Sequence, residues 1–243
     1  MAQNLLSFIG HLEEFRKRLL ISLAAIIAGT LFCFFYVDEI LHILTGPIRS
    51  QIGQIYFFSP SDAFVIKIKA ALLAGLLIAS PLVICELWLF ISPAMYPREK
   101  KALLPVVFIV SFLFIIGALF SFFTVLPMTL GFLIGQQTDF LKPMLSMNEY
   151  LGFLSGMMIG FGFAFNLPVF IVALVASGFV KVRTLNYYHR HIIVLIFIAA
   201  AVLTPGPDIA SQMMLAIPLL FLFEFSLLAG WLVEKAKKKE VSR

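Results

Sequence analysis

Three carboxylates stand beside basic residues in the polar segments of the chain. Glu13 and Glu14 are followed four positions later by Lys17 and Arg18, and Glu99 lies between two basic residues in the segment 98–101. Residues four apart face one another on a helix, and exposed ion pairs of this kind contribute only about 0.3–0.5 kcal/mol. Taken alone, this pattern indicates ordinary solvated ion pairs.

Three further polar side chains lie inside long apolar stretches: Glu86, Asn166 and Glu224. An ionisable group at membrane depth is costly, so each needs a partner or a function. For the two glutamates, a hydrogen-bonded place in the bundle interior or a water-filled recess and a role in binding or coupling are equally consistent with the sequence. Asn166 precedes Pro168 by two positions, and its amide is expected to satisfy the carbonyl of Ala164 that the proline leaves without a donor.

The sequence gives little support for catalysis. The four histidines, His11, His42, His189 and His191, all fall in connecting segments, and no serine has the glycine and histidine neighbours of an intramembrane protease. Phosphate-binding loops and Cys/His metal spacings are also absent from the sequence. We therefore expect a protein that is not an enzyme and that uses no cofactor and no metal.

The composition indicates an integral membrane protein. The chain has 243 residues, of which 61% are hydrophobic and 13% charged, and its mean hydropathy is +1.03. A soluble domain does not tolerate that much apolar surface. The net charge of +5 comes from short basic segments between apolar runs, a pattern that orients membrane proteins and argues against nucleic-acid binding.

Six apolar runs are predicted to cross the membrane, since roughly 20 helical residues span its hydrocarbon core. The predicted spans are residues 19–37, 66–91, 102–127, 149–178, 192–204 and 209–233. Residues 1–18 form an amphipathic surface helix, a turn near 38–44 is broken by Gly46 and Pro47, and 234–243 is a basic tail. Residues 1–243 are expected to form a single all-α domain, kinked at Pro81, Pro168 and Pro218. Within the fourth span, Gly152, Gly156 and Gly160 are spaced to let another helix approach closely.

Basic residues are concentrated in every second polar segment along the chain. They concentrate in the N-terminal segment, in residues 98–101, in residues 181–190 and in the tail, whereas the other connections hold few. The positive-inside rule then places both termini in the cytoplasm.

Five motifs recur in the same order as in a known family. They are HLEEFRKRL at 11–19, TGP at 45–47, SPLVICELWLFISPAMYPREKK at 80–101, FGFAFNLP at 161–168 and TPGPDIASQMMLAIPLLFLFE at 204–224. On these motifs the chain resembles TatC, the multi-spanning subunit of the twin-arginine (Sec-independent) protein translocase. The resemblance covers nearly the whole chain.

The resemblance implies a concave bundle of six helices, with short fifth and sixth helices, in the inner membrane. It implies a receptor for twin-arginine signal peptides of folded cargo, driven by the proton motive force, that self-associates and assembles with the single-span subunits TatA and TatB. Glu14 and Glu99 match the family's acidic recognition positions, where a carboxylate can accept the planar fork of a guanidinium. Further signal-peptide residues on the family pattern are Arg16, Arg18, Phe90, Pro93 and Tyr96. Thr204, Asp208 and Gln212 match the partner-helix docking region.

The chain departs from the family pattern at two positions. Asn166 stands where the family usually has a glutamate, and Glu86 stands where relatives often have glutamine. One hypothesis is that the buried carboxylate has moved, so that Glu86 supplies what the fourth-span acid supplies elsewhere. The alternatives to a receptor are a proton- or ion-coupled small-solute carrier that uses Glu86 and Glu224, and a scaffold that only assembles other membrane proteins.

Overall fold

The computed structural model describes residues 2–52, 56, 59–91, 103–135, 144–203 and 209–241. The chain divides into two compact units, Met1–Gly46 with Phe57–Phe112 and Pro47–Tyr56 with Leu113–Arg243. Throughout the described ranges the regular elements are helices, and the one extended pairing is an isolated bridge between Tyr56 and Ser146. The all-α prediction is confirmed. That the six spans form one domain stays a prediction.

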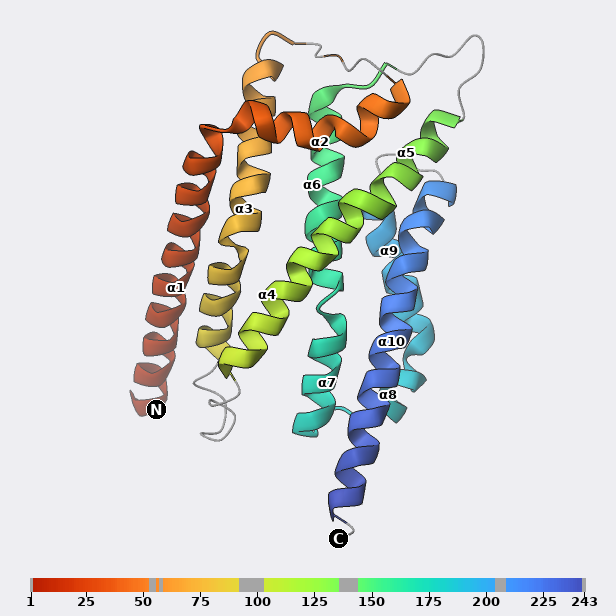
Figure 1. The fold of residues 1–243 in the computed structure, drawn as a ribbon. Helices are drawn as coiled ribbons and strands as arrows, with labels where there is room; N and C mark the ends of the chain where they lie inside the picture. Colours follow the sequence, from red (N-terminus) through yellow and green to blue (C-terminus); the bar gives the residue numbers. More distant parts are fainter. Residues whose placement is uncertain are drawn as a thin grey trace. The chain divides into compact units, whose positions relative to one another are not determined.

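The first unit is built on two antiparallel helices, α1 (Ala2–Phe34) and α3 (Asp62–Ile91), which lie side by side (Figure 1). Their backbones touch where Gly29 faces Gly75, because a Cβ on Gly75 would lie 2.4 Å from the backbone N of Thr30. The prediction of a separate surface helix ending at residue 18 is wrong. The stretch around Arg18 contains no glycine or proline, so nothing interrupts the helix there.

The connection between α1 and α3 contains a second helix, α2 (Val37–Ile52), where the sequence predicted a single turn. Pro47 lies inside this helix. A proline removes one backbone hydrogen bond, but a helix can contain one when packing stabilises its other turns. Leu44 and Thr45, in the turn before Pro47, are buried and provide such packing. An ion pair of 2.8 Å between Lys67 Nζ and Asp38 Oδ1 ties the start of α2 to α3.

The third span begins in the first unit, belongs to the second from Leu113 onward, and continues beyond its predicted end at residue 127. It consists of α4 (Leu103–Phe120), a π-helical segment η3 (Ser121–Val125) and α5 (Leu126–Gly135). Gly117 lies against the backbone of the fourth span, since a Cβ there would be 2.5 Å from the carbonyl oxygen of Phe161. The predicted close approach at Gly152 is wrong, because a Cβ at that position would meet nothing within 4 Å.

The fourth span is two helices, α6 (Met147–Ala164) and α7 (Leu167–Ser177). Pro168 lies in the first turn of α7, where its missing N–H costs little. Asn166 supports the break, but its Nδ2 donates to the carbonyl of Gly162 at 2.9 Å, not to that of Ala164 as predicted. Among the described atoms, the buried Oδ1 of Asn166 has no hydrogen-bond partner.

The last helices are α8 (Val182–Tyr187), α9 (His189–Leu203) and α10 (Ile209–Val241), and α10 packs along α7 and α9 (Figure 1). The fifth span is short, as predicted, with 15 residues in α9. The sixth is not short, because α10 has 33 residues. It continues through the predicted basic tail, whose Glu, Lys and Ala residues are good helix formers.

The apolar helices match a multi-pass membrane protein. Five helical stretches of the described chain are long and apolar enough to cross a bilayer. The described chain also contains one shorter apolar helix. The five are Leu12–Phe34, Asp62–Phe90, Pro105–Gly135, Met147–Ala176 and Gln212–Lys235, and the shorter one is His189–Val202. These agree with the six-span prediction.

Candidate functional site

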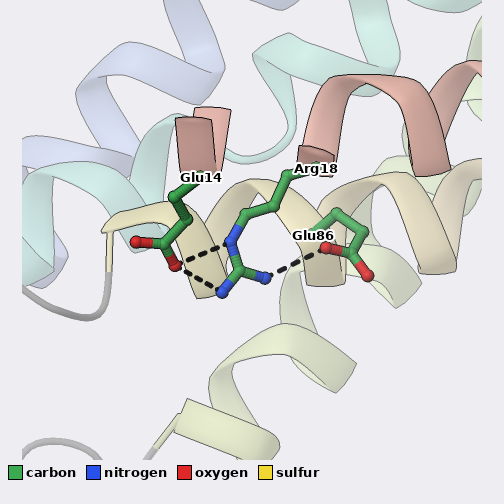
Figure 2. Close-up of polar contacts among 3 residues, drawn as sticks. All are labelled: Glu14, Arg18 and Glu86. Carbon is green, nitrogen blue, oxygen red and sulfur yellow. Dashed lines mark hydrogen bonds and ion pairs between the residues drawn. The ribbon is translucent and has the colours of Figure 1, made fainter. Parts of the chain in front are cut away.

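A cluster of three charged side chains forms where the first half of α1 crosses the end of α3. Arg18 donates to Glu14 through Nε (3.0 Å) and Nη2 (2.6 Å), both to Oε1, and its Nη1 donates to Oε2 of Glu86 at 3.0 Å (Figure 2). The antiparallel run of the two helices brings Glu86 beside the first helix. We call Glu14, Arg18 and Glu86 the acidic cluster.

The side chains of the acidic cluster are partly buried by the protein. The exposed fractions of its side chains are 31% for Glu14, 23% for Arg18 and 17% for Glu86. Partial burial raises the strength of each charge-assisted hydrogen bond above that of a fully solvated pair. The cluster holds two carboxylates and one guanidinium, so it has more acids than bases.

The ion pair between Glu14 and Arg18 is therefore confirmed, and it is only part of a larger arrangement. The matching pair between Glu13 and Lys17 is not formed: both side chains are exposed, and the ion pairs found in the described ranges do not include them. The difference arises because Arg18 turns toward α3, where it gains a second partner.

An aromatic contact lies next to the acidic cluster. The rings of Phe15 on α1 and Phe90 on α3 have their centroids 5.3 Å apart at an interplanar angle of 59°. Tilted aromatic pairs at this distance are attractive beyond the area that they bury. The contact fixes α3 against α1 one turn away from Glu86, and it adds an apolar border to the charged cluster.

The structure brings together three of the residues predicted for signal-peptide binding, Glu14, Arg18 and Phe90. Arg16 is also on α1 but is exposed and does not join the cluster. Glu99, Pro93 and Tyr96 lie outside the described residues. Sequence reasoning treated Glu86 as a separate intramembrane acid and did not single out Phe15 for the site.

Signals for both omissions were available in the sequence. Phe15 lies three positions before Arg18, on the same side of a helix, and an antiparallel hairpin places the end of the second span near the start of the first. The hypothesis that Glu86 replaces a fourth-span acid stays a prediction, and Arg18 gives Glu86 a partner within its own unit.

The other polar candidates lie in the second unit. Glu224 on α10 is 55% exposed and pairs with His189 of α9, with 3.2 Å between Oε1 and Nε2. Glu224 therefore has a hydrogen-bonding partner, as expected, whereas its place in a protein interior or a water-filled recess stays a prediction. Its exposure arises because α10 packs on α7 and α9 along another face, on which Phe223 and Leu227 are buried.

Gln212 ties the start of α10 to α9. Its Nε2 donates to the carbonyl oxygen of Phe197 at 2.8 Å. The other two predicted docking residues, Thr204 and Asp208, lie outside the described residues. In the ranges that are described, no three His, Cys, Asp or Glu side chains are grouped so that they could hold a metal ion.

Comparison with known proteins identifies the family. Residues 10–218 match the family model described as TatC, Sec-independent protein translocase protein. The chain is 34% identical to the TatC protein of Carboxydothermus hydrogenoformans over 242 residues, 100% of this chain and 98% of the relative. It is 36% identical to that of Aquifex aeolicus over 237 residues, covering 96% and 98% of the two chains.

A solved structure agrees with these matches. A crystal structure of a twin-arginine translocase receptor, TatC, in the detergent DDM superposes with a TM-score of 0.82 at 35% sequence identity. The match covers 90% of this chain and 99% of that one. Sequence and fold agree over almost the full length, and the chain belongs to the TatC family of Sec-independent protein translocase proteins.

Proposed function

We propose that this TatC-family protein is the receptor subunit of its translocase and that it binds twin-arginine signal peptides of folded cargo at the acidic cluster. The observation that carries the proposal is the partly buried Glu14 carboxylate, which lies in a cluster with more acids than bases. In this reading the protein catalyses no reaction. It recognises a peptide and assembles the machinery that moves the cargo.

The chemistry of the acidic cluster suits arginine. A guanidinium presents five N–H donors in a plane and matches a carboxylate at two points, whereas an ammonium acts as a compact point charge. The cluster already holds one guanidinium, that of Arg18, between two carboxylates. The rings of Phe15 and Phe90 beside it suit the apolar stretch that follows the arginines in a signal peptide. Glu99 is proposed as a second recognition carboxylate.

The proposed topology places this site at the cytoplasmic face of the inner membrane. The alternation of basic and uncharged connections supports cytoplasmic termini. The start of α1 and the end of α3 then meet the cytoplasm, where a signal peptide arrives before export. Transport would be driven by the proton motive force.

The single-span partners TatA and TatB are proposed to dock on α9 and α10, near Thr204, Asp208 and Gln212. The hydrogen bond from Gln212 to Phe197 supports this, because it fixes the start of α10 against α9. At 1.5 Å per residue, the 15 residues of α9 extend about 22 Å, less than the roughly 30 Å hydrocarbon thickness of a bilayer. A short helix thins the bilayer locally. We propose that this thinning assists transport, and that receptor subunits self-associate.

The receptor proposal is tested by peptide binding to the purified full-length protein in detergent. A fluorescent twin-arginine peptide is titrated, with a twin-lysine peptide as the specificity control. Glu14→Gln should weaken twin-arginine binding about tenfold or more, because hydrogen bonds to charged groups contribute about 1.5–3 kcal/mol. The matched control is Glu13→Gln, which removes the same charge from an exposed neighbour that forms no ion pair in the described chain. Equal binding of the two peptides, or equal loss in the two variants, would contradict the proposal.

A further inference from the structure

Arg18 donates to only one oxygen of each carboxylate in the acidic cluster. Its Nε and Nη2 both donate to the same oxygen of Glu14, and its Nη1 donates to one oxygen of Glu86. Figure 2 shows that the second oxygen of each carboxylate points away from the guanidinium. Each carboxylate therefore retains an acceptor that Arg18 leaves unused.

Arg18 is also a competitor built into the site. It lies four residues after Glu14 on the same helix, so it is always within reach of that carboxylate. A guanidinium that arrives on a peptide must share Glu14 with Arg18 or replace it. Replacement would leave Arg18, only 23% exposed, without a partner unless a second carboxylate accepts it, and unpaired charges in partly buried positions are costly.

Glu86 is that second carboxylate. It approaches Arg18 from α3, opposite Glu14, and is the least exposed member of the acidic cluster at 17%. Its position is fixed by the Phe15–Phe90 contact one turn further along α3 and by the close backbone contact of Gly29 and Gly75 further from that end. The acceptor for a displaced Arg18 is thus already in place before a ligand arrives.

We infer that Glu86 is a positioning residue for the receptor site: it shares Arg18 with Glu14 and keeps Arg18 paired when a ligand guanidinium takes Glu14. The inference rests on the proposed function. Without Glu86, a displaced Arg18 has no second carboxylate in the acidic cluster, so Arg18 stays on Glu14 and Glu14 is less available to a ligand. Glu86 acts through Arg18 and does not itself contact the peptide.

Three variants of the full-length protein, measured by the same peptide titration, test the inference. Glu86→Gln should weaken twin-arginine binding about fivefold or more, which exceeds the effect of Glu13→Gln, because it leaves Arg18 committed to Glu14. Glu86→Asp keeps the charge but shortens the side chain by one methylene, so it should also weaken binding. Arg18→Gln should strengthen binding, because it removes the competitor.

The decisive comparison is a double-mutant cycle. In the Arg18→Gln background, adding Glu86→Gln should change affinity no more than Glu13→Gln does. A loss that persists in this background would show that Glu86 contacts the peptide directly and would overturn the inference. Weaker binding by Arg18→Gln alone would also overturn it, since Arg18 would then organise the carboxylates.

Folding and function are separated by two further measurements. If Arg18→Gln does not fold, Arg18→Lys replaces it, because an ammonium lacks the planar fork that gives Arg18 two hydrogen bonds to Glu14 and competes less for that carboxylate. Stronger binding is again expected, and weaker binding contradicts the inference. The proposed function fails if the wild-type protein does not distinguish twin-arginine from twin-lysine peptides. If it does distinguish them while both Glu86 variants bind like the wild type, only the positioning role fails.

Discussion

Arg18 Nη1 and Glu86 Oε2 lie 3.0 Å apart although 68 positions separate the two residues in the chain. This bond joins two helices, whereas the bond from Arg18 to Glu14 lies within one turn of α1. A local ion pair, which would contribute little on an exposed helix, thereby becomes part of a cross-helix cluster. In the proposed receptor, the position of α3 against α1 consequently sets how much of Glu14 is available to a peptide.

The first prediction concerns the contact that sets this position. In Gly75→Ala the new Cβ would lie 2.4 Å from the backbone N of Thr30 and 2.7 Å from the carbonyl carbon of Gly29, so α1 and α3 must separate. Overpacking of this kind costs about 1–3 kcal/mol. We expect a lower thermal midpoint of the detergent-solubilised protein and weaker binding of the twin-arginine peptide.

Gly46→Ala is the matched control, because a Cβ at Gly46 meets nothing within 4 Å. It should leave the thermal midpoint unchanged or slightly raised, since alanine is the better helix former. Equal thermal midpoints for Gly75→Ala and Gly46→Ala would mean that the two helices do not pack at this glycine pair.

The second prediction concerns the aromatic border of the acidic cluster. Phe90→Ala removes the ring that contacts Phe15, and such contacts contribute about 0.5–1.5 kcal/mol beyond the buried area. Peptide affinity should fall less than in Glu14→Gln, and the thermal midpoint should fall as well. Phe32→Ala is the control, because that ring pairs with Tyr36 at the other end of α1. A binding loss as large in Phe32→Ala would argue against a local role for Phe90.

The third prediction concerns Gln212. Gln212→Leu removes the donor to the carbonyl of Phe197, a loss of about 0.5–1.5 kcal/mol. Amide hydrogen exchange in the second half of α9 should become faster. Met213→Leu, a change at the exposed neighbouring position, should leave the exchange unchanged. Unaltered exchange in Gln212→Leu would show that this hydrogen bond does not hold α9 to α10.

The fourth prediction concerns the length of α9. Inserting four leucines after Ile198 adds about 6 Å and removes most of the mismatch with the bilayer. Export of a folded reporter with a twin-arginine signal should fall. The control replaces the exposed Val194, Ile198 and Val202 with leucine and keeps the length, and its export should be normal. Normal export by the lengthened protein would refute a role for local thinning.

Much of the fold follows from local sequence properties. Apolar length predicts the spans, and the short α9 is visible as an interrupted run before the TPGPD turn. The continuous α1 was missed because the change from polar to apolar composition near Arg18 resembles a boundary, whereas a helix ends only where backbone hydrogen bonds are lost. The helical course of α2 through Pro47 depends on burial of the preceding turn, which spacing alone does not reveal.

The sequence predicts part of the candidate site as well. The helix spacing predicts the pair of Glu14 and Arg18, and the family pattern adds Phe90 to the same group. The place of Glu86 depends on the register of two helices, and that register is set by the Gly29–Gly75 contact. Asn166 shows the same limit: Pro168 indicates a helix break in the sequence, but only the structure shows that the amide of Asn166 donates to the carbonyl of Gly162.

Crosslinking shows directly whether a twin-arginine peptide binds beside the acidic cluster. A twin-arginine peptide with a photoreactive group next to its arginines is irradiated with the full-length protein in native membranes, and the products are mapped by mass spectrometry. Crosslinks are expected to the first half of α1 and the end of α3, around Glu14, Arg18 and Phe90, and a twin-lysine peptide should not form them. Crosslinks confined to α9 and α10, or the same crosslinks with the twin-lysine peptide, would contradict the receptor proposal.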